Sequence, residues 1–362
     1  MEKIKYNIKE RTSPVELPES LGFGKIFSDH VFEVDYSPGK GWHNPSITEI
    51  SHLPIHPATM FIHYGQAVFE GLKAFKQTDG NVVIFRAKNH FERINNSSRR
   101  VCIPELDVDF MLEALKELVY IERDWIPTTK GEALYIRPFI YGSDPFLGVG
   151  SSKNYKCIIL LSPVGAYYPE GFNPVKILAQ DDYVRAVRKG LGECKTPANY
   201  AASLLAGEEA VKKGFTQVLW LDGVKQKHIE EVGTMNIFIN LKDEIVTPKL
   251  NGSILPGITR RTVIELLKEW NMNIVERDIT IDEVVSAYDD GNLLGIFGTG
   301  TAAIISTVGW LTYKDKEMTL NNGKPNKLDL KLFNEITAIH YGEKEDTHNW
   351  LMQVEKKGVE VG

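Results

Sequence analysis

Glu230-Glu231-Val232-Gly233-Thr234-Met235-Asn236 leads from two acidic residues into an apolar run, residues 234–241, that is typical of a strand. A carboxylate beside such a strand is either a solvated residue at a sheet edge or the partner of a cationic ring nitrogen in a bound cofactor. The segment alone leaves both interpretations open, so the segments around it have to be considered.

A lysine segment precedes it. Gly192-Glu193-Cys194-Lys195-Thr196-Pro197-Ala198-Asn199-Tyr200 places Lys195 in a loop before a predicted helix over residues 201–213, and 36 residues before Glu231. Most loop lysines are solvated. A lysine that forms a Schiff base needs a partly desolvated site, because burial lowers the pKa of its amine.

Two glycine-containing segments could bind an anion. Leu255-Pro256-Gly257-Ile258-Thr259-Arg260 opens a predicted helix over residues 259–270, and the N-terminus of a helix offers unpaired N–H groups to a phosphate. Phe297-Gly298-Thr299-Gly300-Thr301-Ala302 could form a nest of backbone amides. Most helix starts bind nothing, and each of these signals is weak when it stands alone.

A strand in the first half of the chain presents a polar face. In Leu134-Tyr135-Ile136-Arg137-Pro138, the period of two places Tyr135 and Arg137 on one face and Leu134 and Ile136 on the other. A tyrosine and an arginine on one face form a plausible contact for a carboxylate. The alternative is an ordinary half-exposed strand.

The remaining pattern predicts a mixture of strands and helices without a long βαβ alternation, hence an α+β or mixed α/β fold. The first forty residues are expected to be irregular. Further strands are predicted over residues 82–85, 132–141, 155–161, 216–221 and 273–279, and further helices over 89–101, 107–123 and 328–341. Three prolines and two glycines between Ser162 and Pro174 predict an interdomain linker over residues 164–175, dividing a domain 1–163 from a domain 176–362.

Composition excludes several classes of protein. Hydrophobic residues make up 43% and charged residues 25% of the 362 residues, which excludes a disordered chain and a fibre. The chain has 42 basic and 48 acidic residues, so it lacks the basic excess of a nucleic-acid-binding protein. The densest basic cluster, Arg99-Arg100 with Arg93 nearby, is interpreted as a solvated helix face, with proximity to an anionic ligand as the alternative.

The spacing of the cysteines and the lengths of the apolar runs predict the compartment. Cys102, Cys157 and Cys194 are far apart, which argues against a disulfide framework and against a zinc or other metal site. The first eleven residues are charged and lack the apolar region of a signal peptide, and the longest apolar run, residues 157–161, is too short to span a membrane. We therefore expect a cytoplasmic protein without membrane partners.

The order of these segments is more specific than any one of them. Tyr64-Gly65-Gln66-Ala67-Val68-Phe69-Glu70-Gly71-Leu72-Lys73-Ala74-Phe75, Phe85-Arg86, the strand of Tyr135, the lysine segment and the segments of Glu231, Gly257 and Thr301 follow one another. In this order the chain resembles the branched-chain aminotransferases of the fold-type IV pyridoxal phosphate class, from about residue 23 to residue 341. The resemblance implies a smaller N-terminal α/β domain and a larger C-terminal pseudo-barrel domain that carries the Schiff-base lysine.

The resemblance also implies roles for individual residues toward pyridoxal 5′-phosphate. Lys195 would be the Schiff-base lysine and the proton carrier, Tyr200 would contact the phenolic oxygen, and Glu231 would pair with the ring nitrogen. The residues expected to bind the phosphate are Arg86, Ile258, Thr259 and Thr301. Thr234 is expected at both the cofactor and the substrate.

On the substrate side, the resemblance implies that the α-carboxylate meets Tyr135, Arg137, Thr301 and Ala302. A largely aromatic pocket would be formed by Phe27, Tyr64, Phe69, Tyr167 and Thr234. Such a pocket discriminates weakly between side chains that differ by one methylene. The expected reaction is reversible transfer of the amino group of L-leucine, L-isoleucine or L-valine to 2-oxoglutarate by ping-pong half-reactions through pyridoxamine phosphate, in a homodimer whose loop 142–152 lies near the neighbouring subunit's site.

Three alternatives are kept. A D-amino-acid aminotransferase and an aminodeoxychorismate lyase have the same fold, but these families have shorter chains and lack the Tyr-Ile-Arg-Pro strand. A non-catalytic protein that binds a phosphate ligand is the third, and the combination of Lys195, Glu231 and Arg86 argues against it. Animal members of the family carry a Cys-x-x-Cys after the Gly-Thr loop, whereas this chain has Ala302-Ala303-Ile304-Ile305-Ser306, which argues against a thiol switch there.

Overall fold

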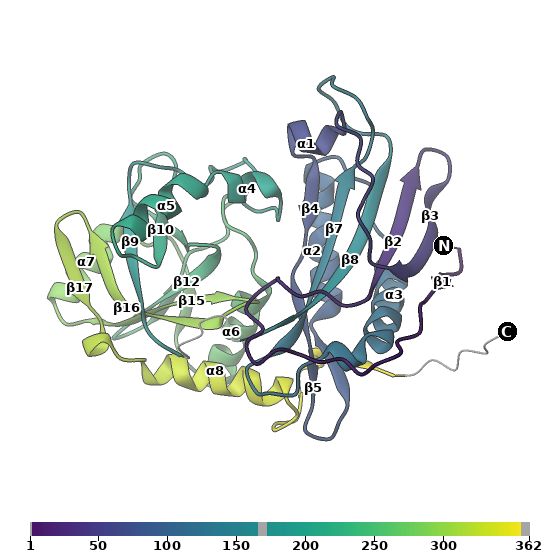
Figure 1. Cartoon of the computed structure of the whole chain (residues 1–362). Coiled ribbons are helices and arrows are strands. Elements are labelled where there is room, and N and C mark those ends of the chain that lie inside the picture. The colour runs from purple at the N-terminus through teal and green to yellow at the C-terminus, as the bar shows by residue number, and fades with distance from the viewer. Residues whose placement is uncertain (1, 166–171, 356–362) are drawn as a thin grey trace. The chain divides into compact units, whose positions relative to one another are not determined.

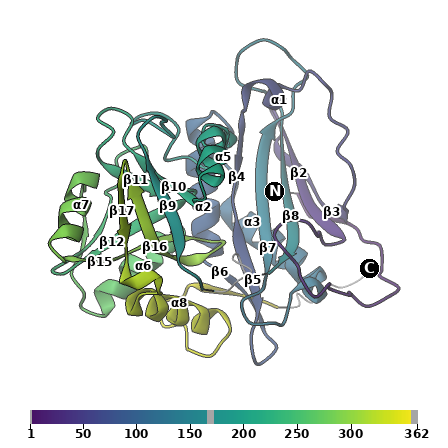
Figure 2. The same cartoon turned by 60° about the vertical axis from the view of Figure 1, so that its left-hand side comes forward.

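The computed structural model of the chain describes residues 2–165 and 172–355 (Figures 1 and 2). It groups them in two compact units. Of the described residues, the first unit comprises 2–165 and 337–355, and the second comprises 172–336. These units are groups of residues that contact one another, which does not show that each folds on its own. The division into two domains with a linker over residues 164–175 therefore stays a prediction.

The first unit contains a nine-stranded sheet in the order β1-β3-β2-β8-β7-β5-β6-β18, with β4 paired to β7. Its strands are β1 (Lys5–Asn7), β2 (His30–Ser37), β3 (Gly41–Glu49), β4 (Ala67–Phe69), β5 (Leu72–Lys76), β6 (Val82–Phe85), β7 (Ala133–Gly142), β8 (Tyr155–Val164) and β18 (Leu351–Val354). Only the β1–β3 pair is parallel among these strands. Because β18 pairs with β6, the C-terminal part of the chain belongs to this unit.

Helices α2 (Ala87–Arg100) and α3 (Val108–Ile121) pack against this sheet and form the main apolar core with it (Figure 1). The side chain of Asp107 begins α3 by accepting a hydrogen bond from the Phe110 amide. The apolar residues of α3 recur at intervals of three and four, so they share one face and are buried. The shorter helices of the unit are α1 (Met60–Tyr64) and the 3₁₀ turn η1 (Arg123–Trp125).

The second unit contains a closed barrel of six strands. The ring runs β11-β10-β9-β16-β15-β12, and a further pairing of β12 with β11 closes it. Its strands are β9 (Val175–Gln180), β10 (Gln217–Leu221), β11 (Ile229–Val232), β12 (Met235–Leu241), β15 (Leu293–Gly300) and β16 (Ile304–Tyr313). The short strands β13 (Ile245–Thr247), β14 (Ile274–Glu276) and β17 (Lys316–Thr319) extend the sheet. The barrel and the mixed α/β class confirm the predicted fold.

Helices surround this barrel (Figure 2). They are α4 (Pro197–Ala201), α5 (Leu204–Lys212), α6 (Ile258–Glu269), α7 (Ile281–Asp289), the 3₁₀ turn η2 (Asn321–Gly323) and α8 (Lys327–His340), whose last four residues belong to the first unit. Thr280 caps α7 by accepting from the Glu283 amide. The stacked rings of Phe238 and Phe297, 5.0 Å apart, join β12 to β15. None of the helices in the described residues has both the length and the apolar character needed to cross a membrane.

Several local predictions are wrong. Residues 30–37 form strand β2, because neighbours on both sides, β3 and β8, complete its hydrogen bonds. The helix expected over 201–213 corresponds to α5, which begins only at Leu204 because the separate short helix α4 ends at Ala201. The strand expected over 273–279 shortens to β14, because its partner β13 has only three residues. Arg93, expected on a solvated helix face, is buried and paired with Glu70.

A buried carboxylate in the second unit gives a prediction about stability. Asp329 lies in the first turn of α8, where Thr307 donates to its Oδ2 at 2.8 Å and its Oδ1 has no hydrogen-bond partner. Burial raises the pKa of Asp329 to about 7. The native chain therefore keeps a proton that the unfolded chain has released, so this group destabilises the fold progressively as pH rises from about 4 to about 7.

We expect Asp329→Asn to remove this pH dependence. Its unfolding temperature should match that of the wild type at pH 4.5 and exceed it by roughly 2–4 °C at pH 8, measured by differential scanning calorimetry. Asp315→Asn, on an exposed turn, is the control and should change neither value. An Asp329→Asn difference that is the same at both pH values would contradict the prediction.

Candidate active site

Lys195 lies in the loop that precedes α4, and α4 carries Tyr200. The Lys195 Nζ donates a hydrogen bond to the Tyr200 hydroxyl at 2.8 Å, and both side chains are half-buried. Pro197 at the start of α4 favours the helix, because its fixed φ suits the first helical position. The Asn199 side chain donates to the carbonyls of Leu191 and Cys194, so it holds the lysine loop against the helix. The loop position expected for Lys195 is confirmed.

Glu231 stands in a row of polar side chains that crosses the barrel. It pairs with Asn236 on β12, and Asn236 pairs with Thr299 on β15, so the three side chains share one face of the sheet. All three are buried. Asn236 Nδ2 donates to Glu231 Oε1 at 3.3 Å, whereas Thr299 Oγ1 is buried without a hydrogen-bond partner. A bound polar group would satisfy such an atom.

Arg185 is a residue of this site that the sequence analysis missed. Its guanidinium lies 3.2 Å from Glu231 Oε2 and donates to the Ser253 carbonyl at 2.6 Å. Burial raises the pKa of Glu231, while Arg185, the Leu255 amide and the nearby Lys195 oppose this shift. Residues 181–188 carry no periodicity or motif that marks Arg185, so no sequence signal identifies it.

The loop before α6 is held directly against this row. The Leu255 amide donates to Glu231 Oε1 at 2.9 Å, and Asn236 Nδ2 donates to the Leu255 carbonyl at 2.8 Å. Gly257 caps α6, and a Cβ at this position would lie 1.9 Å from Asn236 Oδ1, so only glycine permits the approach. Because glycine offers no capping side chain, the first amides of α6, at Ile258 and Thr259, stay available to an anion.

Two tight turns of the barrel carry the remaining predicted residues of the second unit. Gly233 and Thr234 connect β11 to β12, with Gly233 at φ 57°, so the strand predicted from Thr234 begins at Met235. Thr234 is exposed at the tip of this turn. Thr301 and Ala302 lie half-buried in the turn between β15 and β16. These two residues are therefore placed in a turn, as the Gly-Thr pattern predicts.

In the first unit, β7 places Tyr135 and Arg137 on one face, as predicted, while Leu134 and Ile136 point into the core. Arg137 donates to the Tyr135 hydroxyl at 2.9 Å, and its guanidinium lies 4.8 Å from the centre of the Phe69 ring. Its Nε is buried without a hydrogen-bond partner, and no carboxylate among the described residues pairs with Arg137. A half-buried arginine in this state is suited to bind an anion.

Lys73 extends this polar face and was not assigned a role from the sequence. It lies opposite Tyr135 on β5, and Ser162 lies opposite Tyr135 on β8. Burial lowers the pKa of Lys73 to about 8. Burial and the Lys73 charge together lower the pKa of the neighbouring His340 to about 3. The alternation of residues 72–76 was the signal that could have placed Lys73 on this face.

Arg86 stands at the N-terminal end of α2 in the left-handed region, with φ 49°. This conformation costs a residue with a side chain about 1 kcal/mol or more, so the surroundings must hold it. The Arg86 amide donates to the Trp350 carbonyl at 2.6 Å, and the guanidinium lies 4.7 Å from the centre of the Trp350 ring. Arg86 is buried.

The aromatic residues predicted to form the substrate pocket do not all lie together in the structure. Phe69 lies beside Arg137, and Phe23, which was not predicted as a pocket residue, packs edge-on against Tyr135 at 4.9 Å. Phe27 is 44% exposed, and Tyr64 on α1 is 42% exposed with its hydroxyl bonded to the Leu147 carbonyl. Tyr167 lies outside the described residues.

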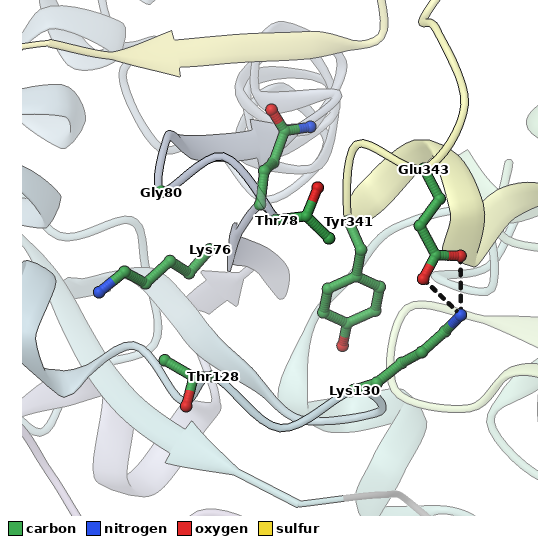
Figure 3. A pocket seen from close by; sticks show the side chains of 8 residues that line it. Lys76, Thr78, Gly80, Thr128, Lys130, Tyr341 and Glu343 are labelled. Carbon is green, nitrogen blue, oxygen red and sulfur yellow. Dashed lines mark hydrogen bonds and ion pairs between the residues drawn. The ribbon is translucent and has the colours of Figure 1, made fainter.

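A separate cavity of about 350 Å³ in the first unit contains none of the predicted residues (Figure 3). It lies between the β5–β6 turn, residues 128–130 and the end of α8, and Lys130 pairs there with both carboxylate oxygens of Glu343 at 2.7 Å. Elsewhere in this unit Asp29, His30 and Glu122 are close enough to hold a metal ion. His30 already uses both ring nitrogens, since Nδ1 bonds Glu122 at 2.6 Å and Nε2 accepts from the Lys9 amide.

Comparisons with known proteins agree with this geometry. The family model described as amino-transferase class IV matches residues 67–301. The chain is 51% identical to branched-chain-amino-acid aminotransferase 2 of Bacillus subtilis (strain 168) over 97% of each chain. It is 37% identical to the branched-chain-amino-acid aminotransferase of Mycolicibacterium smegmatis, over 97% of this chain and 98% of that one.

Solved structures of branched-chain aminotransferases are also similar to this chain. The branched-chain amino acid aminotransferase of Escherichia coli superposes with a TM-score of 0.75 at 26% identity, covering 91% of this chain and all of that one. The branched-chain aminotransferase of the archaeon Thermoproteus uzoniensis, solved with norvaline, superposes with a TM-score of 0.74 at 25% identity and the same coverage. A further branched-chain amino acid aminotransferase, solved with pyridoxamine 5′-phosphate, gives a TM-score of 0.76 at 25% identity. The chain therefore belongs to the class IV aminotransferases, and within them to the branched-chain-amino-acid aminotransferase family.

Proposed function

We propose that the chain is a branched-chain-amino-acid transaminase that transfers the amino group of L-leucine, L-isoleucine or L-valine to 2-oxoglutarate, with pyridoxal 5′-phosphate as its cofactor. The observation that carries the proposal is the Lys195–Tyr200 hydrogen bond in the same unit as the buried Glu231 and its partner Arg185. A protein that only binds a phosphate ligand has no need of these groups.

The residues fit this cofactor. Glu231 is a buried acceptor for a ring N–H, and a cation there would offset the effect of burial on its carboxylate. Tyr200 offers a hydroxyl to the phenolic oxygen. The uncapped start of α6 at Ile258 and Thr259, the turn at Thr301 and the guanidinium of Arg86 are donors suited to the phosphate. We propose these residues, with Thr234, as its binding residues.

When bound, pyridoxal 5′-phosphate supplies an electron-withdrawing ring that stabilises negative charge at the substrate Cα. Lys195 would hold the cofactor through Nζ and would carry the proton between the substrate Cα and the cofactor C4′. Tyr200 accepts a hydrogen bond from Nζ and so fixes the amine in position. Arg185 and the Leu255 amide favour the ionised form of Glu231, which in turn keeps the ring nitrogen protonated.

On the substrate side we propose that Arg137 and Tyr135 bind the carboxylate, with the amides of Thr301 and Ala302. Arg137 is half-buried and lacks a carboxylate partner among the described residues, and Tyr135 extends its donor set. Phe69 closes one side of the arginine. Phe27, Tyr64, Tyr167 and Thr234 are proposed to complete an apolar pocket. Such a pocket separates the three branched substrates by only about 1–3 kcal/mol, so all three should react.

We also propose a homodimer in the cytoplasm. Phe146, Leu147 and Val149 are 58%, 62% and 88% exposed in the loop between β7 and β8, a concentration of apolar surface that supports a subunit contact. The three cysteines are free thiols in the structure, which supports a reducing compartment.

One prediction concerns the proposed chemistry. The purified chain reconstituted with pyridoxal phosphate should absorb visible light as a yellow protein and convert L-leucine and 2-oxoglutarate to glutamate and the branched 2-oxo acid. Lys195→Ala should lose this absorption band and lose about 10²–10⁴-fold or more in turnover, because the covalent holder and proton carrier is gone. Lys212→Ala on the exposed face of α5 is the matched control.

Activity that is found only with D-alanine, or release of pyruvate from aminodeoxychorismate, would point to one of the other enzymes of this fold. A chain that stays colourless with added cofactor would contradict the proposal altogether.

Another prediction concerns the carboxylate contact. A Cβ at Gly71 would lie 1.9 Å from the Tyr135 hydroxyl, so Gly71→Ala must displace that hydroxyl from Arg137. We expect the KM for L-leucine to rise about tenfold with a smaller change in kcat, corresponding to the loss of one hydrogen bond to a charged group. Gly207→Ala, where a Cβ meets nothing within 4 Å, should leave both constants unchanged.

Assembly gives a further prediction. Light scattering should give the wild type about twice the chain mass of 40.8 kDa. Leu147→Asp should shift the equilibrium toward the monomer, because burial of an unpaired carboxylate in a contact is unfavourable. Lys153→Asp, on the exposed end of the same loop, serves as the charge control. Monomeric wild-type protein would exclude the proposed dimer.

A further inference from the structure

Glu70 is a buried carboxylate for which the proposed mechanism has no task. It follows β4 directly and is 1% exposed. Arg93 donates to it twice, from Nε at 2.7 Å and from a terminal guanidinium nitrogen at 2.9 Å, and His90 Nδ1 lies 2.7 Å from Oε2. The Gly71 amide donates a further bond at 3.2 Å. The chain itself thus makes four contacts with this carboxylate, three with Oε2 and one with Oε1.

The carboxylate of Glu70 stays ionised in this cluster. Burial by itself would raise the pKa of Glu70, but Arg93 and His90 outweigh burial and hold that pKa well below its usual range. Glu70 is therefore an anion throughout the working pH range and accepts no proton from a substrate. Because Glu70 is buried and the groups that contact its carboxylate belong to the chain itself, we assign it an indirect role in the reaction.

One arm of the cluster leads to Arg86. His90 and Arg93 follow Arg86 by four and seven residues on α2, so all three lie on one face of that helix. The His90 amide also donates to the Arg86 carbonyl at 3.3 Å. By holding two successive turns of this face, Glu70 fixes the helix end at which Arg86 adopts its left-handed conformation.

The other arm leads to Arg137. The Glu70 amide donates to the Pro138 carbonyl at 2.8 Å, directly after Arg137 on β7. Its chain neighbours both contact the carboxylate-binding residues, since the Phe69 ring lies under the Arg137 guanidinium and Gly71 packs against the Tyr135 hydroxyl. The conformation of the segment 69–71 therefore decides where Arg137 and Tyr135 present their donors.

A buried ion cluster is an inefficient way to gain stability alone, because apolar residues of similar volume often stabilise a core equally well. Its distinctive property is direction: the bidentate Arg93 fork and the His90 bond allow one arrangement of α2 against the segment 69–71. Apolar packing would permit small sliding movements. Such movements would displace Arg86 and Arg137 relative to each other.

We propose that Glu70 is a positioning residue that joins Arg86, proposed for the cofactor phosphate, and the Tyr135–Arg137 pair, proposed for the substrate carboxylate, into one rigid element. The inference rests on the proposed function for the roles of Arg86 and Arg137. It predicts that loss of the Glu70 charge weakens cofactor binding and substrate binding together, although Glu70 touches neither.

The test compares Glu70→Gln with Glu92→Gln, which removes an exposed carboxylate from the same helix. Three quantities are measured: the dissociation constant of pyridoxal phosphate, from fluorescence titration of the apoprotein; the KM values for L-leucine and 2-oxoglutarate; and the unfolding temperature. For Glu70→Gln we expect the dissociation constant and both KM values to rise about tenfold, while Glu92→Gln matches the wild type.

The outcomes separate the possibilities. A folded Glu70→Gln protein with a wild-type dissociation constant and wild-type KM values overturns the inference, even if its unfolding temperature falls. A rise in the dissociation constant alone, or in the KM values alone, shows that Glu70 does not join the two sets of binding residues and also overturns it. If Glu70→Gln is insoluble, Arg93→Lys replaces it, because lysine keeps the positive charge but cannot form the bidentate contact. For Arg93→Lys we expect the dissociation constant of the cofactor and the KM values to rise about threefold. Wild-type constants in this variant would overturn the inference. A wild type that neither binds the cofactor nor transfers amino groups refutes the proposed function instead.

Discussion

Strand β11 pairs with both β10 and β12, and this double pairing is the constraint on which the second unit depends. It closes six strands into a barrel and leaves no edge in the ring. Closure also decides the local chemistry, because it aligns Glu231, Asn236 and Thr299 in one row. The loop before α6 hydrogen-bonds to the first two of these side chains, so the barrel fixes the position at which that helix starts.

Each unit buries one carboxylate against an arginine, with opposite electrostatic results. Glu70 receives a bidentate fork and a histidine, so its pKa falls despite burial. Glu231 has a single, longer contact with Arg185 at 3.2 Å, and burial prevails, so its pKa rises. The difference fits the proposed tasks. Glu70 is held by four contacts from the chain and is proposed to position its neighbours, whereas Glu231 Oε2 has the single Arg185 contact and is proposed to accept one more donor from a cationic ring nitrogen.

The first unit shows how a polar surface can be built on a sheet whose other face is apolar. Lys73, Tyr135 and Ser162 lie opposite one another on β5, β7 and β8, and Leu134 and Ile136 occupy the core side of β7. The anion binding proposed for this face needs only a few positioned donors, so it is compatible with a chain whose net charge is −6.

Local patterns in the sequence determined much of this. The period of two predicted the faces of Tyr135 and Arg137, helical spacing predicted α3, and glycine at 257 marked the start of α6, because all three depend on backbone geometry within a few residues. Strand β2 and the burial of Arg93 depend instead on partners far away in the chain, and Arg185 stands in no motif at all. Only the tertiary structure brought Glu70 to Arg93 and Arg185 to Glu231, since contacts between distant segments follow from packing and leave no periodic trace in the sequence.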